Sequence, residues 1–239
     1  MSGGVDSSVA AALLKEQGYN VTGVTMKIWG GQTSSEFSIH HGCYGPGEEE
    51  DIDDARRVAQ QLDIPFHVLD LTGEYQSEVL DYFSREYLSG RTPNPCVRCN
   101  PNIKFGALIE KARRSGLVFN SIASGHYARV EYDAQQNRYI LKKAKDLTKD
   151  QAYFLSFLSQ EQLAELIFPL GGYTKTEVRA LANRRGLHIA AKSDSQNLVY
   201  GDYTSLTKTK STTGPIFDKG GNLLGHHQGI QFYTIGQRK

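Results

Sequence analysis

Residues 2–29 read SGGVDSSVAAALLKEQGYNVTGVTMKIW, a glycine turn followed by one helix-like and one strand-like segment. The alanine- and leucine-rich run from Val5 to Gln17 predicts a helix. The β-branched residues between Asn20 and Trp29 predict a strand. A glycine turn that enters a helix suits an anion, because its backbone N–H groups can approach phosphate closely near the positive end of the helix dipole. This stretch therefore predicts an α/β fold with a phosphate site at its start.

The same alternation continues through the first two-thirds of the chain. Apolar residues at helical spacing and short β-branched runs follow one another with short connections. Such alternation predicts a mostly parallel sheet, whose active site lies at the carboxyl ends of the strands. The further predicted helices are Asp51–Leu62, Tyr75–Tyr87 and Ile103–Ser115, and the predicted strands are Ile64–Leu71 and Ser121–Gly125.

The pattern changes after Arg129. Tyr139–Lys143 predicts one strand of a hairpin, and the sequence from Gly214 onward is rich in turns and β-like. Three helices are predicted between them, over Gln151–Leu158, Gln160–Phe168 and Lys175–Gly186.

Composition excludes several classes of protein. Of the 239 residues, 39% are hydrophobic and 22% are charged, which excludes disorder of the whole chain. No apolar run approaches the roughly 20 residues that a membrane span needs, so no membrane partner is expected. The net charge is only +1, but residues 36–86 carry a net −10 and residues 101–150 a net +5. This asymmetry fits an anionic partner on one face, or ordinary solvated faces.

The cysteines point to thiol or metal chemistry. There are three, Cys43, Cys96 and Cys99, and no signal peptide, which favours the reducing cytoplasm over a disulfide framework. Cys96 and Cys99 lie in the proline-stiffened loop GRTPNPCVRCN, residues 90–100, predicted to precede a helix. Their spacing allows both to bind one metal or to exchange a disulfide. Neighbouring basic side chains are expected to lower the thiol pKa values, namely those of Arg91, Arg98 and Lys104.

The glycine turn contains groups that could act on a nucleotide. Ser7 and Ser8 supply hydroxyl donors, and Asp6 could orient Mg²⁺ or polarise a reacting group. A capping turn with Asp6 as the N-cap is the structural alternative. The turn lacks Gly-Lys-Ser/Thr, so it is not a Walker loop.

As a block, SGGVDSS resembles the pyrophosphate loop of N-type ATP pyrophosphatases. The chain as a whole resembles tRNA-specific 2-thiouridylases, on blocks such as GRTPNPCVRCNPNIKFGAL (90–108), SGHYARV (124–130) and FPLGGYTKTEVR (168–179). The resemblance implies that the protein replaces O2 of the wobble uridine of tRNA with sulfur, through an adenylated intermediate made from ATP and Mg²⁺. It also implies a parallel-sheet ATP pyrophosphatase domain of the adenine nucleotide alpha hydrolase-like type, a small central α+β domain and a C-terminal β-barrel.

On this basis the chain is expected to divide into three parts. Residues 1–150 form the pyrophosphatase domain, residues 151–192 complete it and contact tRNA, and residues 193–239 form a truncated, β-rich central domain. Because the chain opens inside a glycine turn and stops within a pattern, the first strand and the C-terminal barrel are expected to be absent.

The resemblance also assigns roles to residues. Cys99 falls at the nucleophile position, and Cys96 and Asp6 are predicted to act with it in catalysis. For Lys149 and Asp150 a helix N-terminus is the structural alternative, and for His126 a hydrogen-bonded structural histidine is as plausible as a nucleotide contact. The implied nucleotide contacts are Ser2, Gly3, Gly4, Val5, Asp6, Ser7, Met26 and Gly125; the implied target-base contacts are Asn94, Pro95 and Cys96; and the implied tRNA contacts are Lys149, Asp150 and Gln151.

The chain departs from the family at its cysteines. Much of the family has a second cysteine where this chain has Val199, and those members have Asp where this chain has Cys96. Their two-cysteine persulfide cycle therefore cannot operate here. Cys43, Cys96 and Cys99 could instead hold a [4Fe-4S] cluster that leaves one iron open for sulfur, by analogy with related sulfur-transfer enzymes. Zinc held by the three thiolates with His40 or His41, and a Cys96–Cys99 redox pair, are the alternatives.

The sulfur donor is expected to be a persulfide carrier or free sulfide. Two other functions remain open from the sequence. One is an adenylating pyrophosphatase that acts on a small-molecule carbonyl, which would need no thiols. The other is a non-enzymatic RNA-binding module with a structural metal, against which the intact loop at residues 2–8 argues.

Overall fold

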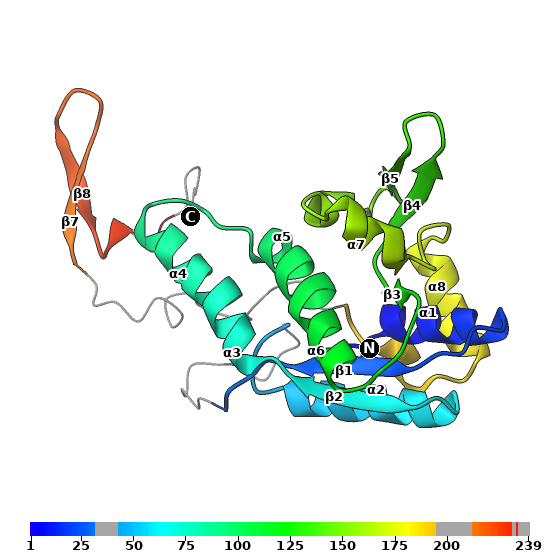
Figure 1. Ribbon diagram of the computed structural model, residues 1–239. Helices are drawn as coiled ribbons and strands as arrows, with labels where there is room; N and C mark the ends of the chain where they lie inside the picture. Colours follow the sequence, from blue (N-terminus) through cyan, green and yellow to red (C-terminus); the bar gives the residue numbers. More distant parts are fainter. Residues whose placement is uncertain (32–42, 195–211, 231–232, 234–239) are drawn as a thin grey trace.

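The structure is a computed structural model that describes residues 1–31, 43–194, 212–230 and 233. Its first layer is a β–α–β unit (Figure 1). Strand β1 (Gly23–Lys27) pairs in parallel with β2 (Phe66–Asp70), with Met26 opposite Leu69, and helix α2 (Glu48–Gln61) connects them. The Glu48 carboxylate accepts the backbone N–H of Ile28 at 2.7 Å, so α2 begins at the carboxyl end of β1.

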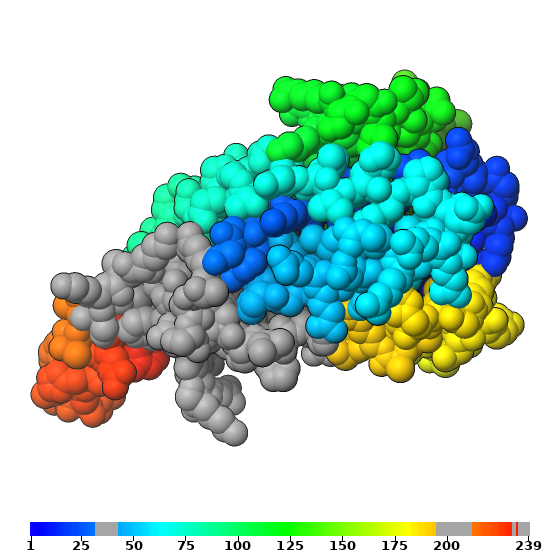
Figure 2. All heavy atoms as spheres, turned by 90° about the horizontal axis from the view of Figure 1, so that it is seen from below, coloured from blue at the N-terminus to red at the C-terminus, as the bar shows by residue number. Residues whose placement is uncertain are grey.

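Helices α1 (Val5–Glu16) and α8 (Lys175–Arg184) pack together beside this unit (Figure 1). Their apolar faces share one core cluster that includes Val9 and Val178, both fully buried, and Val58 of α2. Figure 2 shows the residues of α2 and α8 next to one another on the lower face. The predicted helices over these three segments are confirmed.

Two helical columns stand side by side above the sheet (Figure 1). The first runs through α3 (Thr72–Tyr75), the π-helical η1 (Gln76–Leu80) and α4 (Asp81–Leu88). The second runs through α5 (Pro95–Cys99), the π-helical η2 (Asn100–Ala107) and α6 (Leu108–Arg114). The first extends beyond its predicted helix at both ends; the second begins before its predicted helix and ends at Arg114, one residue short of the predicted end.

The prediction that the Cys96–Cys99 segment is a loop before a helix is wrong. The second column already begins at Pro95, because the Asn94 side chain accepts the backbone N–H of Val97 at 3.3 Å and so caps it. Pro95 stands at the first helical position, where its fixed φ favours the helix and no N–H is needed.

A second parallel pair and a hairpin follow. Strand β3 (Ile122–Ala123) pairs in parallel with β6 (Leu166–Ile167), and β4 (Ala128–Asp133) pairs antiparallel with β5 (Arg138–Lys143). Two predictions fail here. Gln151–Leu158 contains only the 3-10 helix η3 (Ala152–Leu155), and α7 (Gln160–Glu165) ends early because the next two residues form β6.

The described residues end with a second hairpin, β7 (Gly214–Phe217) and β8 (Leu223–His227), as the turn-rich sequence predicts. A 3-10 helix, η4 (His188–Ala191), follows α8. Within the described ranges, no helix combines the length and the apolar character that crossing a bilayer requires. The structure shows the predicted α/β class, with parallel strand pairs that α-helices cover.

Candidate nucleotide and thiol site

The glycine turn packs directly against the start of α2. Gly3 has φ +66°, and a Cβ there would lie 2.1 Å from the backbone oxygen of Asp51, so only glycine fits. Gly4 is the N-cap of α1, and the Ser8 hydroxyl donates to its carbonyl oxygen at 2.8 Å. Because α2 begins where β1 ends, the turn lies at the carboxyl end of that strand, as the fold predicts.

Gly125 brings a second segment against the same turn. A Cβ on Gly125 would lie 2.6 Å from the backbone nitrogen of Ser7, so the segment after β3 touches the first turn of α1. The Ser7 hydroxyl in turn accepts the backbone N–H of Ser2 at 3.0 Å. Met26, on β1, is half-buried and packs against a core cluster that contains Tyr75 and Cys99. Seven of the eight predicted nucleotide residues thus surround one helix N-terminus, and Met26 lies on the adjacent strand.

Asp6 is held by two side chains that sequence analysis did not single out. Its carboxylate accepts a hydrogen bond from the Tyr127 hydroxyl at 2.8 Å, and both of its oxygens lie 2.8 Å from Lys175 Nζ. The N-cap of α1 is Gly4, without a side-chain cap, so the capping alternative for Asp6 is wrong. Burial and then the Asp6 charge raise the pKa of Tyr127 far above its usual value, which keeps this hydroxyl a donor.

Lys175 is the one charged residue that is buried among the described residues. It bridges Asp6 and Asp194, whose Oδ1 lies 2.7 Å from Lys175 Nζ. Asp194 also pairs with Lys149 at 2.9 Å and with Arg179 at 2.8 Å. Burial alone would raise the pKa of Asp194, but the hydrogen bonds from Lys175 and Lys149 lower it to about 2. Asp194 is therefore ionised at neutral pH.

The thiols lie on and beside helix α5. Cys99 is buried in a cluster with Tyr75, Cys96 is half-buried, and Cys43 is exposed. The residue after Cys43 is Tyr44, whose ring stacks on that of Tyr75 at 5.5 Å inside the same cluster. The loop segment that carries Cys43 therefore approaches the Cys96–Cys99 helix.

The three cysteines influence one another electrostatically. Burial raises the pKa of Cys96, and it raises that of Cys99 to about 12; the charge of Cys43 adds to both increases. Lys104 opposes both shifts, but burial outweighs it. The expectation that basic neighbours lower these pKa values is therefore wrong. Arg91 pairs with Glu86 and Arg98 with Glu78, so neither guanidinium group is directed to the thiols.

The described residues do not form a metal-ligand shell. No group of three or more His, Cys, Asp or Glu side chains within them could hold a metal ion as placed. The positions of His40, His41 and Val199 lie outside the described residues. The described part of the chain thus brings three thiols into one electrostatic neighbourhood, but it shows no site for a metal ion.

The segment Lys149–Gln151 is hydrogen-bonded to the segment that follows Gly125. The Gln151 side chain accepts the backbone N–H of Tyr127 at 2.9 Å, and Asp150 accepts that of Ala144 at 2.8 Å. Asp150 therefore anchors the end of β5 and does not cap a helix. Of the three predicted tRNA residues, Lys149 has the only cationic side chain, and that side chain is 38% exposed.

His126 matches its structural alternative. Its Nδ1 lies 2.8 Å from the Ser124 hydroxyl, and its ring packs between Phe105 and Phe168. Burial, with a smaller effect of Lys104, lowers its pKa well below the usual value, so the ring is neutral at neutral pH. Lys104 thus affects the pKa of His126 as well as those of Cys96 and Cys99, and the ring of the adjacent Phe105 contacts that of His126 at 5.8 Å.

In metal-free protein we expect iodoacetamide to modify Cys43 first, Cys96 next and Cys99 last. The thiolate is the reactive form, and a pKa of about 12 leaves roughly one Cys99 thiol in ten thousand ionised at about pH 8. The rate at Cys99 should rise about tenfold for each pH unit. Peptide mass spectrometry over time measures the order, and modification of Cys99 as fast as Cys43 would contradict it.

Two family models together match nearly the whole chain, including every residue of the site described above. Residues 1–201 match a family model described as tRNA methyl transferase HUP domain, and residues 206–239 match one described as tRNA methyl transferase PRC-barrel domain. The chain is 50% identical over its full length to a protein of Moorella thermoacetica named tRNA-specific 2-thiouridylase MnmA. The chain belongs to the tRNA-specific 2-thiouridylase family. It covers 67% of that relative.

Other 2-thiouridylases are equally similar. A relative from Endomicrobium trichonymphae is 50% identical and one from Geotalea uraniireducens is 52% identical, each over all of this chain. The chain covers 66% and 64% of these two proteins, so it spans about two thirds of the length of its 2-thiouridylase relatives. Among solved structures, an NMN synthetase from Francisella tularensis gives a TM-score of 0.46 at 17% identity, over 85% of this chain and 68% of that one.

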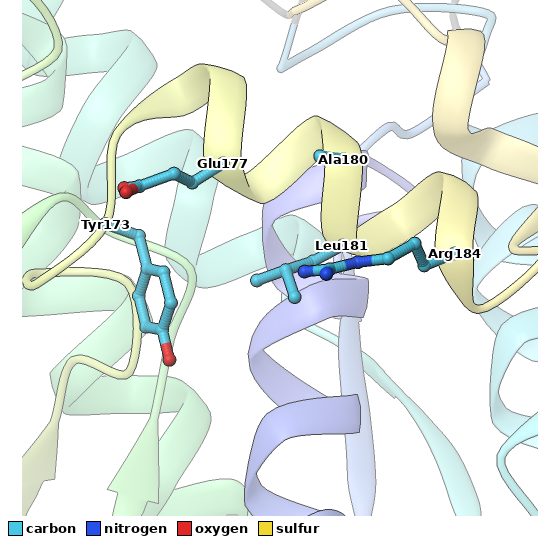
Figure 3. Close-up of a pocket in the computed structure, with 5 residues that line it drawn as sticks. All are labelled: Tyr173, Glu177, Ala180, Leu181 and Arg184. Atoms are coloured by element: carbon cyan, nitrogen blue, oxygen red, sulfur yellow. The ribbon is translucent and has the colours of Figure 1, made fainter.

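A hollow beside α8 is lined by residues of that helix and by Tyr173 (Figure 3). It measures about 330 Å³ and is lined by residues that include Tyr173, Glu177 and Arg184. None of the predicted site residues lines it. The Glu177 carboxylate forms an ion pair with Lys145, with Nζ and Oε1 2.9 Å apart. The hollow therefore does not coincide with the predicted nucleotide site.

Proposed function

We propose that this chain carries the catalytic part of an ATP-dependent tRNA-uridine 2-sulfurtransferase, which thiolates the wobble uridine. The observation that supports the proposal is that the helical column with Cys96 and Cys99 meets the segment beside the phosphate loop. The ring of Phe105 on this column contacts that of His126 at 5.8 Å, and Gly125 touches the first turn of α1. Adenylation and sulfur transfer act on the same uridine, so the nucleotide site and the thiols must lie near one another. The full-length identity to named 2-thiouridylases supports the same reaction.

In the first step, ATP with Mg²⁺ binds at residues 2–8. The wobble base is turned out of its stack beside Asn94 and Cys96, because O2 is not reachable within a stack. Uridine O2 attacks the α-phosphorus, the N3 proton is lost, and pyrophosphate leaves. The backbone donors of the turn stabilise the charge that develops on the phosphate. Asp6 supplies a carboxylate for Mg²⁺ once it separates from Lys175.

In the second step, sulfur replaces the adenylated oxygen. A hydrosulfide attacks C2, the C2–O bond breaks, AMP leaves, and N3 regains a proton, so no electrons are transferred. In the persulfide route, the outer sulfur of a Cys99 persulfide bonds to C2, the C2–O bond breaks and AMP leaves. The Cys96 thiolate then attacks Cys99 Sγ, the persulfide S–S bond breaks, the outer sulfur stays on C2, and a Cys96–Cys99 disulfide forms. The three-residue spacing of these cysteines on α5 is compatible with such a pair.

We propose a [4Fe-4S] cluster as the second candidate for the sulfur carrier. When bound, a [4Fe-4S] cluster on Cys43, Cys96 and Cys99 would supply one open iron for a hydrosulfide. The mutual electrostatic effect of the three thiols supports it. The described residues show no site for a metal ion, so the three thiols would have to come together around the cluster. Zinc would require the same approach of the three thiols.

The proposed reaction also implies partners and a location for the protein. We propose tRNA and a persulfide carrier or free sulfide as partners, and the cytoplasm as the location. The division at residues 150 and 192 also stays a prediction.

The test is anaerobic purification of the full chain, followed by measurement of iron, acid-labile sulfide and zinc in the wild type and in Cys43→Ala. A three-cysteine cluster predicts about four irons and four sulfides per chain, lost in the variant together with thiolation. Thiolation that survives loss of Cys43 in iron-free protein would establish the Cys96–Cys99 route. Absence of ATP-dependent AMP release under every condition would favour an RNA-binding module.

A further inference from the structure

Four side chains of alternating charge connect the Lys149 segment with the phosphate turn. Lys149 Nζ lies 2.9 Å from Asp194 Oδ2, Asp194 Oδ1 lies 2.7 Å from Lys175 Nζ, and Lys175 Nζ lies 2.8 Å from both oxygens of Asp6. The four residues come from four separate parts of the sequence. Neither family resemblance nor local pattern indicated that they touch.

The two ends of this chain of charges are open to ligands and the middle is not. The side chains of Lys149 and Asp6 are 38% and 32% exposed, whereas that of Lys175 is 11% exposed. A polyanion can therefore reach Lys149, and a divalent cation can reach Asp6. Lys175 is shared by two carboxylates, so its position depends on how strongly each attracts it.

Asp194 is anchored independently of Lys149. Arg179 donates to its Oδ1 at 2.8 Å and also to the carbonyl oxygens of Ala190 and Lys192, each at 3.1 Å. The guanidinium group is thus fixed by three acceptors. Asp194 can lose its contact with Lys149 and still remain beside Lys175.

We propose that Asp194 is a positioning residue that couples RNA binding at Lys149 to Mg²⁺–nucleotide binding at Asp6. A backbone phosphate that draws Lys149 away leaves Asp194 with fewer cations. Asp194 then attracts Lys175 more strongly, and Lys175 holds Asp6 less. The Asp6 carboxylate becomes available to Mg²⁺, so the coupling is positive. This inference rests on the proposed function, which supplies tRNA and ATP as the two ligands.

The test measures the dissociation constant of Mg²⁺ with an ATP analogue that has a methylene bridge between the α- and β-phosphates. It is measured without RNA and with a saturating, unmodified tRNA transcript that has uridine at the wobble position. In the wild type, RNA should tighten nucleotide binding at least about fivefold. By linkage, the nucleotide should tighten RNA binding by the same factor.

Asp194→Asn and Lys149→Met should both bring this factor to within about twofold of one, below the usual range of such couplings. Lys145→Met is the matched control, because Lys145 is exposed and its carboxylate partner is Glu177; it should keep the wild-type factor. If Asp194 had only a structural role, its replacement would lower the melting temperature or weaken the binding of both ligands. The factor by which RNA tightens nucleotide binding would stay unchanged. Lys149→Met reports on the coupling even if Asp194→Asn fails to fold.

Three results overturn the inference, and two of them leave the proposed function intact. A factor of one in wild-type protein that binds and thiolates the transcript refutes the coupling alone, as does a wild-type factor in folded Asp194→Asn. Failure of the wild type to bind or thiolate any wobble-uridine transcript overturns the proposed function, and the coupling with it.

Discussion

Replacing Asp6 with asparagine is expected to lower the rate of ATP-dependent pyrophosphate release by at least about a hundredfold, the usual effect of removing one preorganised electrostatic group. The amide keeps the shape of the side chain but cannot neutralise Mg²⁺. It also removes one of the two carboxylates that hold Lys175. The expected loss is therefore in the rate and in the Mg²⁺ dependence together, measured as pyrophosphate released per chain at several Mg²⁺ concentrations.

Asp63→Asn is the matched control for this change. Asp63 has a fully exposed side chain and a φ of +47°, a conformation that asparagine also adopts readily, so this variant should retain wild-type rates. Alkylation of Cys96 and Cys99 should also be unaffected by Asp6→Asn, because burial, Lys104 and the neighbouring thiols shift their pKa values. Normal adenylation by a folded Asp6→Asn protein would refute the role of this residue.

The elements around the phosphate turn could be predicted because their signals are local. The helix from Val5, the strand around Met26 and the helix over residues 48–61 follow from apolar spacing and β-branched residues. The glycine turn was predicted for the same reason. Gly3 has the positive φ and the close backbone approach that its position at a helix entry requires.

The contacts that complete the site could not be predicted, because they join residues far apart in the sequence. Thr174-Lys175-Thr176-Glu177 has the pattern of a capping box, and that is what it forms. Nothing in that pattern indicates that the Lys175 side chain meets Asp6, 169 residues away. The signal available was a lysine in an otherwise polar first turn, which is equally common on an exposed helix.

The errors at Cys96 and Cys99 also have a physical cause. The prediction of a lowered thiol pKa counted basic residues near in sequence. In the fold, Arg91 and Arg98 form ion pairs with glutamates, and burial dominates at both thiols. Burial of Cys99 depends on the aromatic cluster with Tyr44 and Tyr75, which comes from other segments.

Replacing Cys99 with alanine is expected to abolish tRNA thiolation, with a loss above about a thousandfold, as for removal of a group that acts covalently. Adenylation should continue, so pyrophosphate release with tRNA remains while 2-thiouridine, measured by mass spectrometry of digested tRNA, disappears. Val97→Ala on the same helix is the control for packing and should keep both activities. Thiolation by folded Cys99→Ala at the wild-type rate would exclude Cys99 from the reaction.

The same assay applied to Cys43 separates the two ways in which Cys99 could act. As a persulfide carrier, Cys99 needs Cys96 to resolve it, so Cys43→Ala retains thiolation and Cys96→Ala does not. As one of three cluster ligands, Cys99 needs both, and all three variants lose thiolation and iron together. The raised Cys99 pKa bears on this choice, because a thiol that is protonated at neutral pH is a poor nucleophile until its surroundings change. A metal bound to Cys99 would displace the proton of its thiol, and a ligand that adds positive charge beside Lys104 would lower its pKa. Only the metal requires Cys43.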